Sequence, residues 1–172
     1  ISDADAMPYF ANNNGKKAAK KRISDIENFM AENDMPGKVS IEVMMKLTAE
    51  NGDRKCKSVV FYGVGTDTSG YTYIRGTAPQ NAGEIAITDK IGDKLNADIG
   101  DKIIISELNG KKEYLITAMF QSMSNMGEGI RLHQDADPDF AQLMGIGCYQ
   151  ISFNDKPDAK ALSSNAHKLQ EL

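Results

Sequence analysis

The sequence predicts an α+β fold, in which antiparallel hairpins and helices occupy separate stretches of the chain. Two Asn-Gly pairs, Asn51-Gly52 and Asn109-Gly110, each separate two stretches with strand patterning, which is the signal of a β-hairpin. The predicted order is helix, hairpin, small mixed block, hairpin, helix, strand, helix. Because strands and helices do not alternate one by one, we exclude a doubly wound parallel sheet.

Composition restricts the class of protein. The 172 residues are 41% hydrophobic and 26% charged, with a net charge of −4, which suits one domain or two small lobes sharing a core. A chain without a basic excess is poorly suited to a phosphate backbone, so we expect no nucleic-acid partner. The longest uncharged run, residues 140–154, is too short and too polar for a membrane span.

The start of the chain and the cysteines bear on its context. The chain begins with Ile1 and has no signal peptide, so we interpret it as a processed chain or an excised piece of a longer protein. Cys56 and Cys148 are compatible with one disulfide, but we favour two buried thiols, the general habit of free cysteine.

The first predicted helix precedes a turn at residues 33–37. Apolar residues recur at helical spacing over residues 23–30. The helix begins either near Asn14, with the basic run in its first turns, or at Ser24, where Ser24 and Glu27 would form a capping box.

The first hairpin follows this helix. Alternating apolar residues predict a strand over residues 38–49, and a second strand runs over residues 55–62. We expect a type I′ turn at Asn51-Gly52. Residues 63–70 are loop-like, and residues 71–74 form either a short strand or an extended link.

The middle of the chain contains a strand, a helix and the second hairpin. Residues 84–87 are predicted as a strand, and Thr88 as the cap of a helix with Ile91, Leu95 and, as a further candidate, Ile99 inward. The second hairpin comprises strands over residues 102–108 and 113–120. It is followed by a polar loop over 121–129 and an extended piece over 130–133.

The last part begins with acidic residues, which favour a helix start, so we predict a helix over residues 138–144 and a glycine break at 145–147. A strand over 148–153 follows. Pro157 then opens a helix through Leu169, with Ala161, Leu162 and Leu169 on its apolar side.

No motif indicates catalysis, a cofactor or a metal. His133 and His167 lack further ligands at zinc spacing. The Asp135-x-Asp137-x-Asp139 run lacks the glycine and glutamate of a calcium loop. The Gly63-x-Gly65 pair lacks the rest of a phosphate loop. We therefore expect a protein that is not an enzyme, with no catalytic, cofactor-binding or metal-binding residues.

Two features are candidates for contacts with other molecules. Met119, Met123 and Met126 lie in or near the 121–129 loop, and methionines fill cores, form adaptable contact surfaces or, more rarely, hold Cu(I). We assign Met123, Asn125, Met126 and Gly127 as the candidate partner or cargo contact. The basic run over residues 16–22 is interpreted as a solvated helix face.

Four segments, taken in order, carry a family resemblance. They are Gly76-Thr77-Ala78-Pro79, residues 83–88, residues 94–103 and residues 113–120. They resemble the extracytoplasmic domain of FtsX-like ABC transporter permeases, the MacB-like periplasmic core domain. In that family a G-x-x-P element leads to a Glu-Ile-apolar strand, a helix, an Ile-Gly-Asp turn and a hairpin. Ala118-Met119-Phe120 departs from the family's Val-Gly-Ile ending, so the resemblance does not identify the cargo.

The resemblance implies a two-lobed architecture. Residues 1–65 and 134–172 would form a membrane-proximal, ferredoxin-like α/β lobe, built from both ends of the chain. Residues 66–133 would form an inserted, small β-rich lobe.

The resemblance also implies a non-catalytic domain on the extracellular or periplasmic side of the cell membrane, anchored by flanking spans of a parent permease. Its partners would be a cytoplasmic ABC ATPase, a second permease copy or an extracytoplasmic protein. It would couple ATP-driven conformational change to export or mechanotransmission. The alternative is a membrane-anchored extracellular ligand- or peptide-binding sensor module without an ATPase.

Overall fold

A computed structural model describes residues 15–140, 148–155 and 157–170. Its helices are α2 (Gly15–Glu32), α3 (Asp89–Leu95) and α4 (Ala159–Gln170), with short 3-10 turns η1 (Thr68–Gly70) and η2 (Ser124–Gly127). Its strands are β1 (Gly37–Asn51), β2 (Arg54–Val64), β3 (Arg75–Gly76), β4 (Glu84–Ile87), β5 (Lys102–Glu107), β6 (Gly110–Met119), β7 (Ile130–Leu132) and β8 (Cys148–Phe153). The predicted mixture of helices and strands is confirmed.

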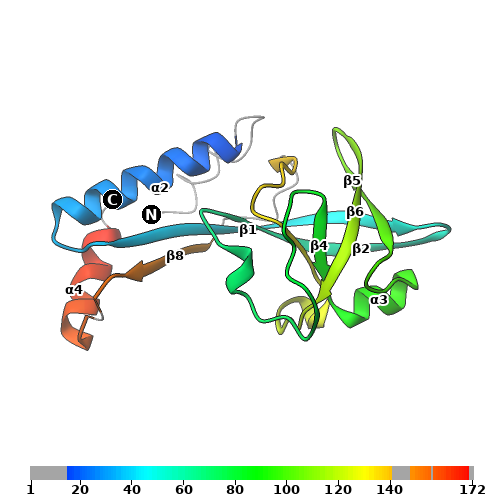
Figure 1. Ribbon diagram of the computed structural model, residues 1–172. Coiled ribbons are helices and arrows are strands. Elements are labelled where there is room, and N and C mark those ends of the chain that lie inside the picture. The colour runs from blue at the N-terminus through cyan, green and yellow to red at the C-terminus, as the bar shows by residue number, and fades with distance from the viewer. Residues whose placement is uncertain (1–14, 141–147, 156, 171–172) are drawn as a thin grey trace.

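The strands form one sheet that closes on itself at one end of the molecule. The order of neighbours is β2-β7-β4-β6-β5-β1-β8, and β1 also pairs with β2, so β1, β2, β7, β4, β6 and β5 make a ring. Two contacts in this ring, β2 with β7 and β4 with β6, are parallel and the others are antiparallel. Figure 1 shows this small barrel on the right, beside α3.

β1 joins the barrel to the other end of the molecule. Its 15 residues pair with β8 over Gly37–Glu42 and with β5 over Thr48–Glu50, while β2 follows it along most of its length. In Figure 1 β1 runs from the barrel to the end where α2 and α4 lie, with α2 above it and α4 below. The sheet is therefore continuous through β1, and a division into lobes at residues 65 and 133 stays a prediction.

The core follows the alternation of β1. Val39, Ile41, Val43, Met45 and Leu47 are buried on one face of this strand, as its pattern predicts. At one end of β1, α2 buries its apolar stripe in the same cluster, through the residues Ala19, Ile23, Ile26 and Met30. At the other end, the interior is completed by α3 and the barrel strands.

A second, smaller cluster lies apart from this core. It contains Val59, Phe61, Ala86, Ala118 and Phe120, with Met44 and Tyr73 packed against it. Beside it, the Arg131 guanidinium lies 3.8 Å from the centroid of the Tyr71 ring and 2.6 Å from Glu42 Oε2, which also accepts a hydrogen bond from the Tyr71 hydroxyl. A cation paired with a carboxylate and stacked on an aromatic ring tolerates burial, so this group attaches the 66–76 segment to β1 and β7.

Several local predictions are corrected by the structure. The helix is already formed at Gly15, which agrees with the predicted start near Asn14, so the alternative start with a capping box at Ser24 and Glu27 is wrong. Glu27 Oε1 instead accepts a hydrogen bond from the backbone N–H of Val39. Both hairpins form, but with turns other than type I′. Gly52 has a positive φ of 55° at the first turn, and at the second only Gly110, just after the turn, has one, of 136°.

Other corrections concern side chains and element ends. Ile99 lies outside α3 and is 37% exposed, and Leu162 on α4 is 49% exposed. Of the two alternatives for residues 71–74, the extended link is confirmed, since the short strand is Arg75–Gly76. Most of the predicted 138–144 helix and its glycine break lie outside the described residues.

The cysteines are both free, as expected, but they are not both buried. Cys56 is half-buried and Cys148 is exposed. The preference for two buried thiols is therefore wrong for Cys148. Its position at the start of β8, which pairs only with β1 among the described strands, explains its exposure.

We expect Ile103→Ala to lower the free energy of unfolding by about 2–5 kcal/mol, because it leaves a cavity inside the barrel. Ile103 on β5 is 0% exposed and belongs to the main cluster. The neighbouring Ile104 is only half-buried, so Ile104→Ala is the matched control and should cost less. Urea unfolding measures both, and equal losses would contradict the assigned faces of β5.

We expect stability to fall in alkaline solution through Tyr114. Burial, assisted by the Glu107 and Asp137 carboxylates, raises the pKa of Tyr114 to about 12. The stabilising effect of the neutral phenol is complete below the unfolded pKa of about 10 and is lost as the pH rises through the folded pKa. Urea unfolding above about pH 9 should show a shallower pH dependence for Tyr114→Phe. An unchanged slope would contradict this assignment.

Candidate functional site

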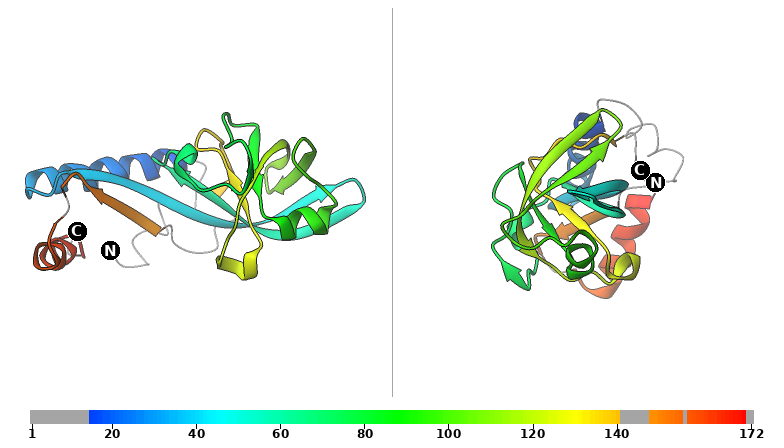
Figure 2. Two further views of the ribbon diagram at one scale, coloured as in Figure 1. Left: turned by 60° about the horizontal axis from the view of Figure 1, so that its bottom comes forward. Right: turned by 90° about the vertical axis from the view of Figure 1, so that its right-hand side faces the viewer.

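The candidate contact residues lie on a protruding loop that follows β6. Met123 is 102% exposed and Met126 is 81% exposed, at and beside the turn η2. In the left view of Figure 2, this yellow segment stands out from the barrel. We call Met123, Asn125, Met126 and Gly127 the methionine tip. The four residues share one exposed turn, and their role as a partner or cargo contact stays a prediction.

The backbone of the methionine tip is strained. Asn125, Met126 and Gly127 have φ values of 48°, 53° and 80°, in the left-handed region. This conformation suits glycine but costs roughly 1–2 kcal/mol for an ordinary L-residue such as methionine. The strain is offset by neighbouring hydrogen bonds. Lys90 Nζ donates to the Met126 carbonyl at 2.5 Å, and Asn125 Nδ2 donates to the Glu128 carbonyl at 3.1 Å.

The base of the tip is attached to α3. Lys94 Nζ lies 2.7 Å from Glu128 Oε1, and the Gly129 N–H donates to Thr88 Oγ1 at 3.2 Å. Thr88 therefore occupies the cap position of α3 without capping it through its side chain. These contacts hold two exposed thioethers in a defined place on the molecular surface.

The tip is suited to contact rather than to coordination. A cavity of about 490 Å³ lies between Met123 and Met126 on one side and the start of α3 on the other. Met119, the third methionine of the predicted group, is 1% exposed in the main core. Only two thioethers thus share the tip, and flexible, polarizable methionines are well adapted to an apolar partner surface.

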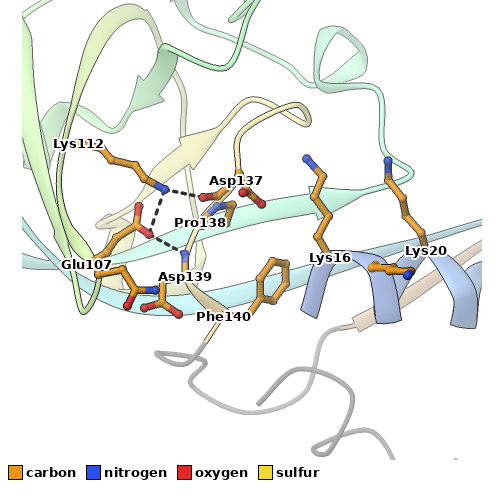
Figure 3. A pocket seen from close by; sticks show the side chains of 10 residues that line it. Lys16, Lys20, Glu107, Lys112, Asp137, Pro138, Asp139 and Phe140 are labelled. Carbon is orange, nitrogen blue, oxygen red and sulfur yellow. Dashed lines mark hydrogen bonds and ion pairs between the residues drawn. The ribbon is translucent and has the colours of Figure 1, made fainter. Parts of the chain in front are cut away.

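A second feature is a lysine-lined pocket of about 470 Å³ between α2 and the barrel. Its lining comprises Lys16, Lys17, Lys20, Glu107, Asn109, Lys112, Asp137, Pro138, Asp139 and Phe140. In Figure 3, Lys16 and Lys20 rise from α2 on one side, opposite Lys112, Glu107 and the 137–139 segment. Only the basic run signalled this pocket in the sequence, because its two walls are more than eighty residues apart.

One wall of the lysine-lined pocket is a network around a buried carboxylate. The Glu107 side chain is 2% exposed, and its Oε2 atom accepts from the Asp139 N–H at 2.6 Å and lies 3.4 Å from Lys112 Nζ. Lys112 Nζ also donates to the Asp137 carbonyl at 2.5 Å. Glu107 Oε1 is buried and has no hydrogen-bond partner among the described residues.

The floor of the pocket joins α2 to the barrel. Lys16 Nζ donates to the Ala136 carbonyl at 2.9 Å, and the Tyr62 hydroxyl donates to the same carbonyl at 2.8 Å. The Phe140 ring packs edge-on against the Tyr62 ring at 5.7 Å between centroids. A Cβ at Gly15 would lie 2.7 Å from Phe140 Cγ, so this close approach requires glycine. Burial and the nearby carboxylates of Asp137 and Asp135 raise the pKa of Tyr62.

A third pocket places Ser69, His133 and Asp135 together, but not as a catalytic triad. Ser69 Oγ donates to Asp67 Oδ1, and His133 Nδ1 accepts from the Asp135 N–H. A triad instead needs the serine hydroxyl bonded to the imidazole and the carboxylate bonded to its other nitrogen. Within the described residues, no group of three His, Cys, Asp or Glu side chains is placed to hold a metal ion.

The fold is shared with extracellular and periplasmic domains of known transporter proteins, and the predicted MacB-like periplasmic domain is confirmed at the level of the fold. The extracellular domain of the noncanonic ABC-type transporter YknZ from Gram-positive bacteria superposes with a TM-score of 0.57 and 10% identity, covering 86% of this chain and 79% of that one.

Two further structures agree. The periplasmic region of MacB from Actinobacillus actinomycetemcomitans gives a TM-score of 0.57 at 8% identity, covering 86% and 72% of the two chains. A domain of a protein assigned as a permease from Porphyromonas gingivalis gives 0.54 at 11% identity, covering 81% and 72%. No family model and no curated protein sequence matches the chain. Among the described helices, none has the length and apolar character needed to cross a bilayer.

We expect the methionine tip to tolerate glycine and to resist β-branched residues. Asn125→Gly should change the free energy of unfolding little, because glycine adopts a positive φ freely. Asn125→Val should lower it by roughly 1–2 kcal/mol, since a β-branched residue is disfavoured in the left-handed region. Thermal or urea unfolding compares the two variants. If valine and glycine behave alike, the tip does not hold the left-handed conformation at Asn125.

Proposed function

We propose that the chain is a non-catalytic extracytoplasmic domain of an ABC transporter permease, coupling ATP-driven conformational change to export or mechanotransmission. The observation that carries this proposal is the shared fold, which extends over 86% of the chain in two of the comparisons. The proposal includes a cytoplasmic ATPase, flanking membrane spans and a location outside the cell membrane. A second permease copy or an extracytoplasmic protein is its further partner.

The sheet supports a mechanical role. β1 pairs with β8 at one end and with β5 at the other, so a displacement of the β8 end reaches the barrel through one continuous strand. Backbone hydrogen bonds to β2 along most of β1 stiffen this connection. Such a strand acts as a lever, since packed elements move together rather than deforming continuously.

The junction at the base of α2 supports the same role. Lys16 and Tyr62 donate hydrogen bonds to one carbonyl, that of Ala136, and Phe140 packs between Tyr62 and Gly15. A shift of α2 is therefore transmitted to the 134–140 segment, and through Tyr62 to β2. The helix and the strand pair provide two mechanical routes into the barrel.

The methionine tip is the proposed contact for the partner or cargo. It protrudes from the barrel, it exposes two thioethers, and its backbone is held in a conformation that costs free energy. Strained backbone conformations concentrate at functional sites, where the surrounding contacts maintain them.

We expect Met123→Asp to abolish or strongly reduce transport by the full permease complex while leaving this domain folded. A carboxylate at the tip would have to be desolvated in an apolar contact, and the site is fully exposed in the free domain. The matched control is Leu108→Asp, since Leu108 is another exposed apolar residue, at 69%, on the β5–β6 turn.

Transport and ATP hydrolysis by the reconstituted complex are the measurements, and circular dichroism of the domain monitors folding. Loss of transport in the tip variant alone supports the proposal. Transport that survives Met123→Asp would remove the tip from the coupling path. A chain that associates with no ATPase-bearing complex would contradict the permease assignment itself.

A further inference from the structure

We propose that the lysine-lined pocket binds a small zwitterion that carries a phosphate group and a primary ammonium group. The phosphate lies against Lys17 and Lys20, and the ammonium lies against the carboxylates of Asp137 and Glu107. Phosphoethanolamine, free or as a lipid headgroup, has this chemistry. The inference rests on the pocket alone and does not depend on the permease assignment.

The lysine wall lacks counter-charges. α2 has no acidic residue in its first turn, and like charges stand four residues apart at Lys16 and Lys20. Both features oppose helix formation. The positive N-terminal end of the helix dipole repels the lysine ammonium groups, and these groups repel one another. Lys16 is bonded to a carbonyl, but Lys17 and Lys20 have no hydrogen-bond or ion-pair partner among the described residues. A phosphate bound between these two ammonium groups would offset the repulsion.

The facing wall has acceptors without donors. Glu107 is almost fully buried, yet its Oε1 atom has no partner within the described part of the chain. Its contact with Lys112 is long, at 3.4 Å, so Lys112 can yield to a second cation. The Asp137 carboxylate is exposed and engaged by no described side chain, and only its carbonyl is bound, by Lys112. A buried acceptor without a donor leaves the Glu107 carboxylate short of compensation. A ligand ammonium with three donors would pair with the exposed Asp137 carboxylate and add positive charge beside Glu107.

The pocket has the size and polarity for this ligand. Its volume of about 470 Å³ lies within the usual range for small-molecule sites, roughly 300–1,000 Å³. Figure 3 shows Lys16 and Lys20 on one side of the space and Lys112 and Glu107 on the other, so the two charges of the ligand meet opposite walls. A simple anion would satisfy the lysines and leave the carboxylate wall unpaired.

The test is calorimetric titration of the chain with four probes: O-phosphoethanolamine, phosphocholine, inorganic phosphate and ethanolamine. We expect phosphoethanolamine to bind at least about tenfold more tightly than each of the others. Phosphocholine lacks the N–H donors, inorganic phosphate lacks the ammonium group, and ethanolamine lacks the phosphate group. Inorganic phosphate that binds as well as phosphoethanolamine would overturn the proposal, as would failure of all four to bind.

Variants locate the site. The double substitution Lys17→Gln with Lys20→Gln, and separately Asp137→Asn, should each weaken phosphoethanolamine binding at least about tenfold. The double control Lys46→Gln with Lys57→Gln removes the same charge from exposed positions on β1 and β2 and should leave binding unchanged. All these side chains are exposed, so folding is not at risk. Equal weakening by the control, or none by the pocket variants, would refute the assignment.

The source of the ligand is distinguished by sedimentation with phosphatidylethanolamine vesicles and with phosphatidylcholine vesicles. Selective binding to the former that is lost in the Lys17/Lys20 variant identifies a lipid headgroup. Binding of the soluble probe without vesicle binding identifies a free zwitterion. Both outcomes support binding of the zwitterion in the pocket. Vesicle binding that is unchanged in the Lys17/Lys20 variant would contradict it.

Discussion

The structure depends on one strand that belongs to two assemblies. β1 is 15 residues long, and its alternating apolar side chains are buried under α2 at one end and inside the barrel at the other. A strand of ordinary length would serve only one of these. Because the side-chain period is two, a slip of one residue would expose the whole apolar face, so the register is firmly specified along its length. The positions of α2, β8 and the barrel follow from that register.

Closure of the barrel solves a second problem. An open sheet of these strands would leave unpaired backbone groups at β5 and β2, whereas pairing both with β1 satisfies them. The short parallel contact between β2 and β7 completes the ring, and Arg131 on β7 ties it to Glu42 on β1. The second, smaller cluster, which includes Phe61, covers part of the barrel, which explains why β2 is buried on both faces.

The two candidate sites lie where this framework ends. The methionine tip follows β6 at the point where the chain leaves the ring, and a hydrogen bond from Lys90 on α3 holds its strained backbone. The lysine-lined pocket lies where α2 meets the barrel, and it is lined by charged side chains from α2, the β5–β6 hairpin and the 137–139 segment.

The sequence by itself determined the local elements. It located both hairpins, the bounds of β4 and β8, the apolar face of β1 and the loop that carries Met123 and Met126, because periodicity and turn residues act over a few positions. Only the tertiary structure decided the ring and the lysine-lined pocket. Parallel strands such as β2 and β7 are not joined by a short turn, so the sequence has no local signal for their pairing. Likewise, the Gly15–Phe140 contact and the facing of Lys20 with Glu107 join distant segments, which depend on packing of the whole chain.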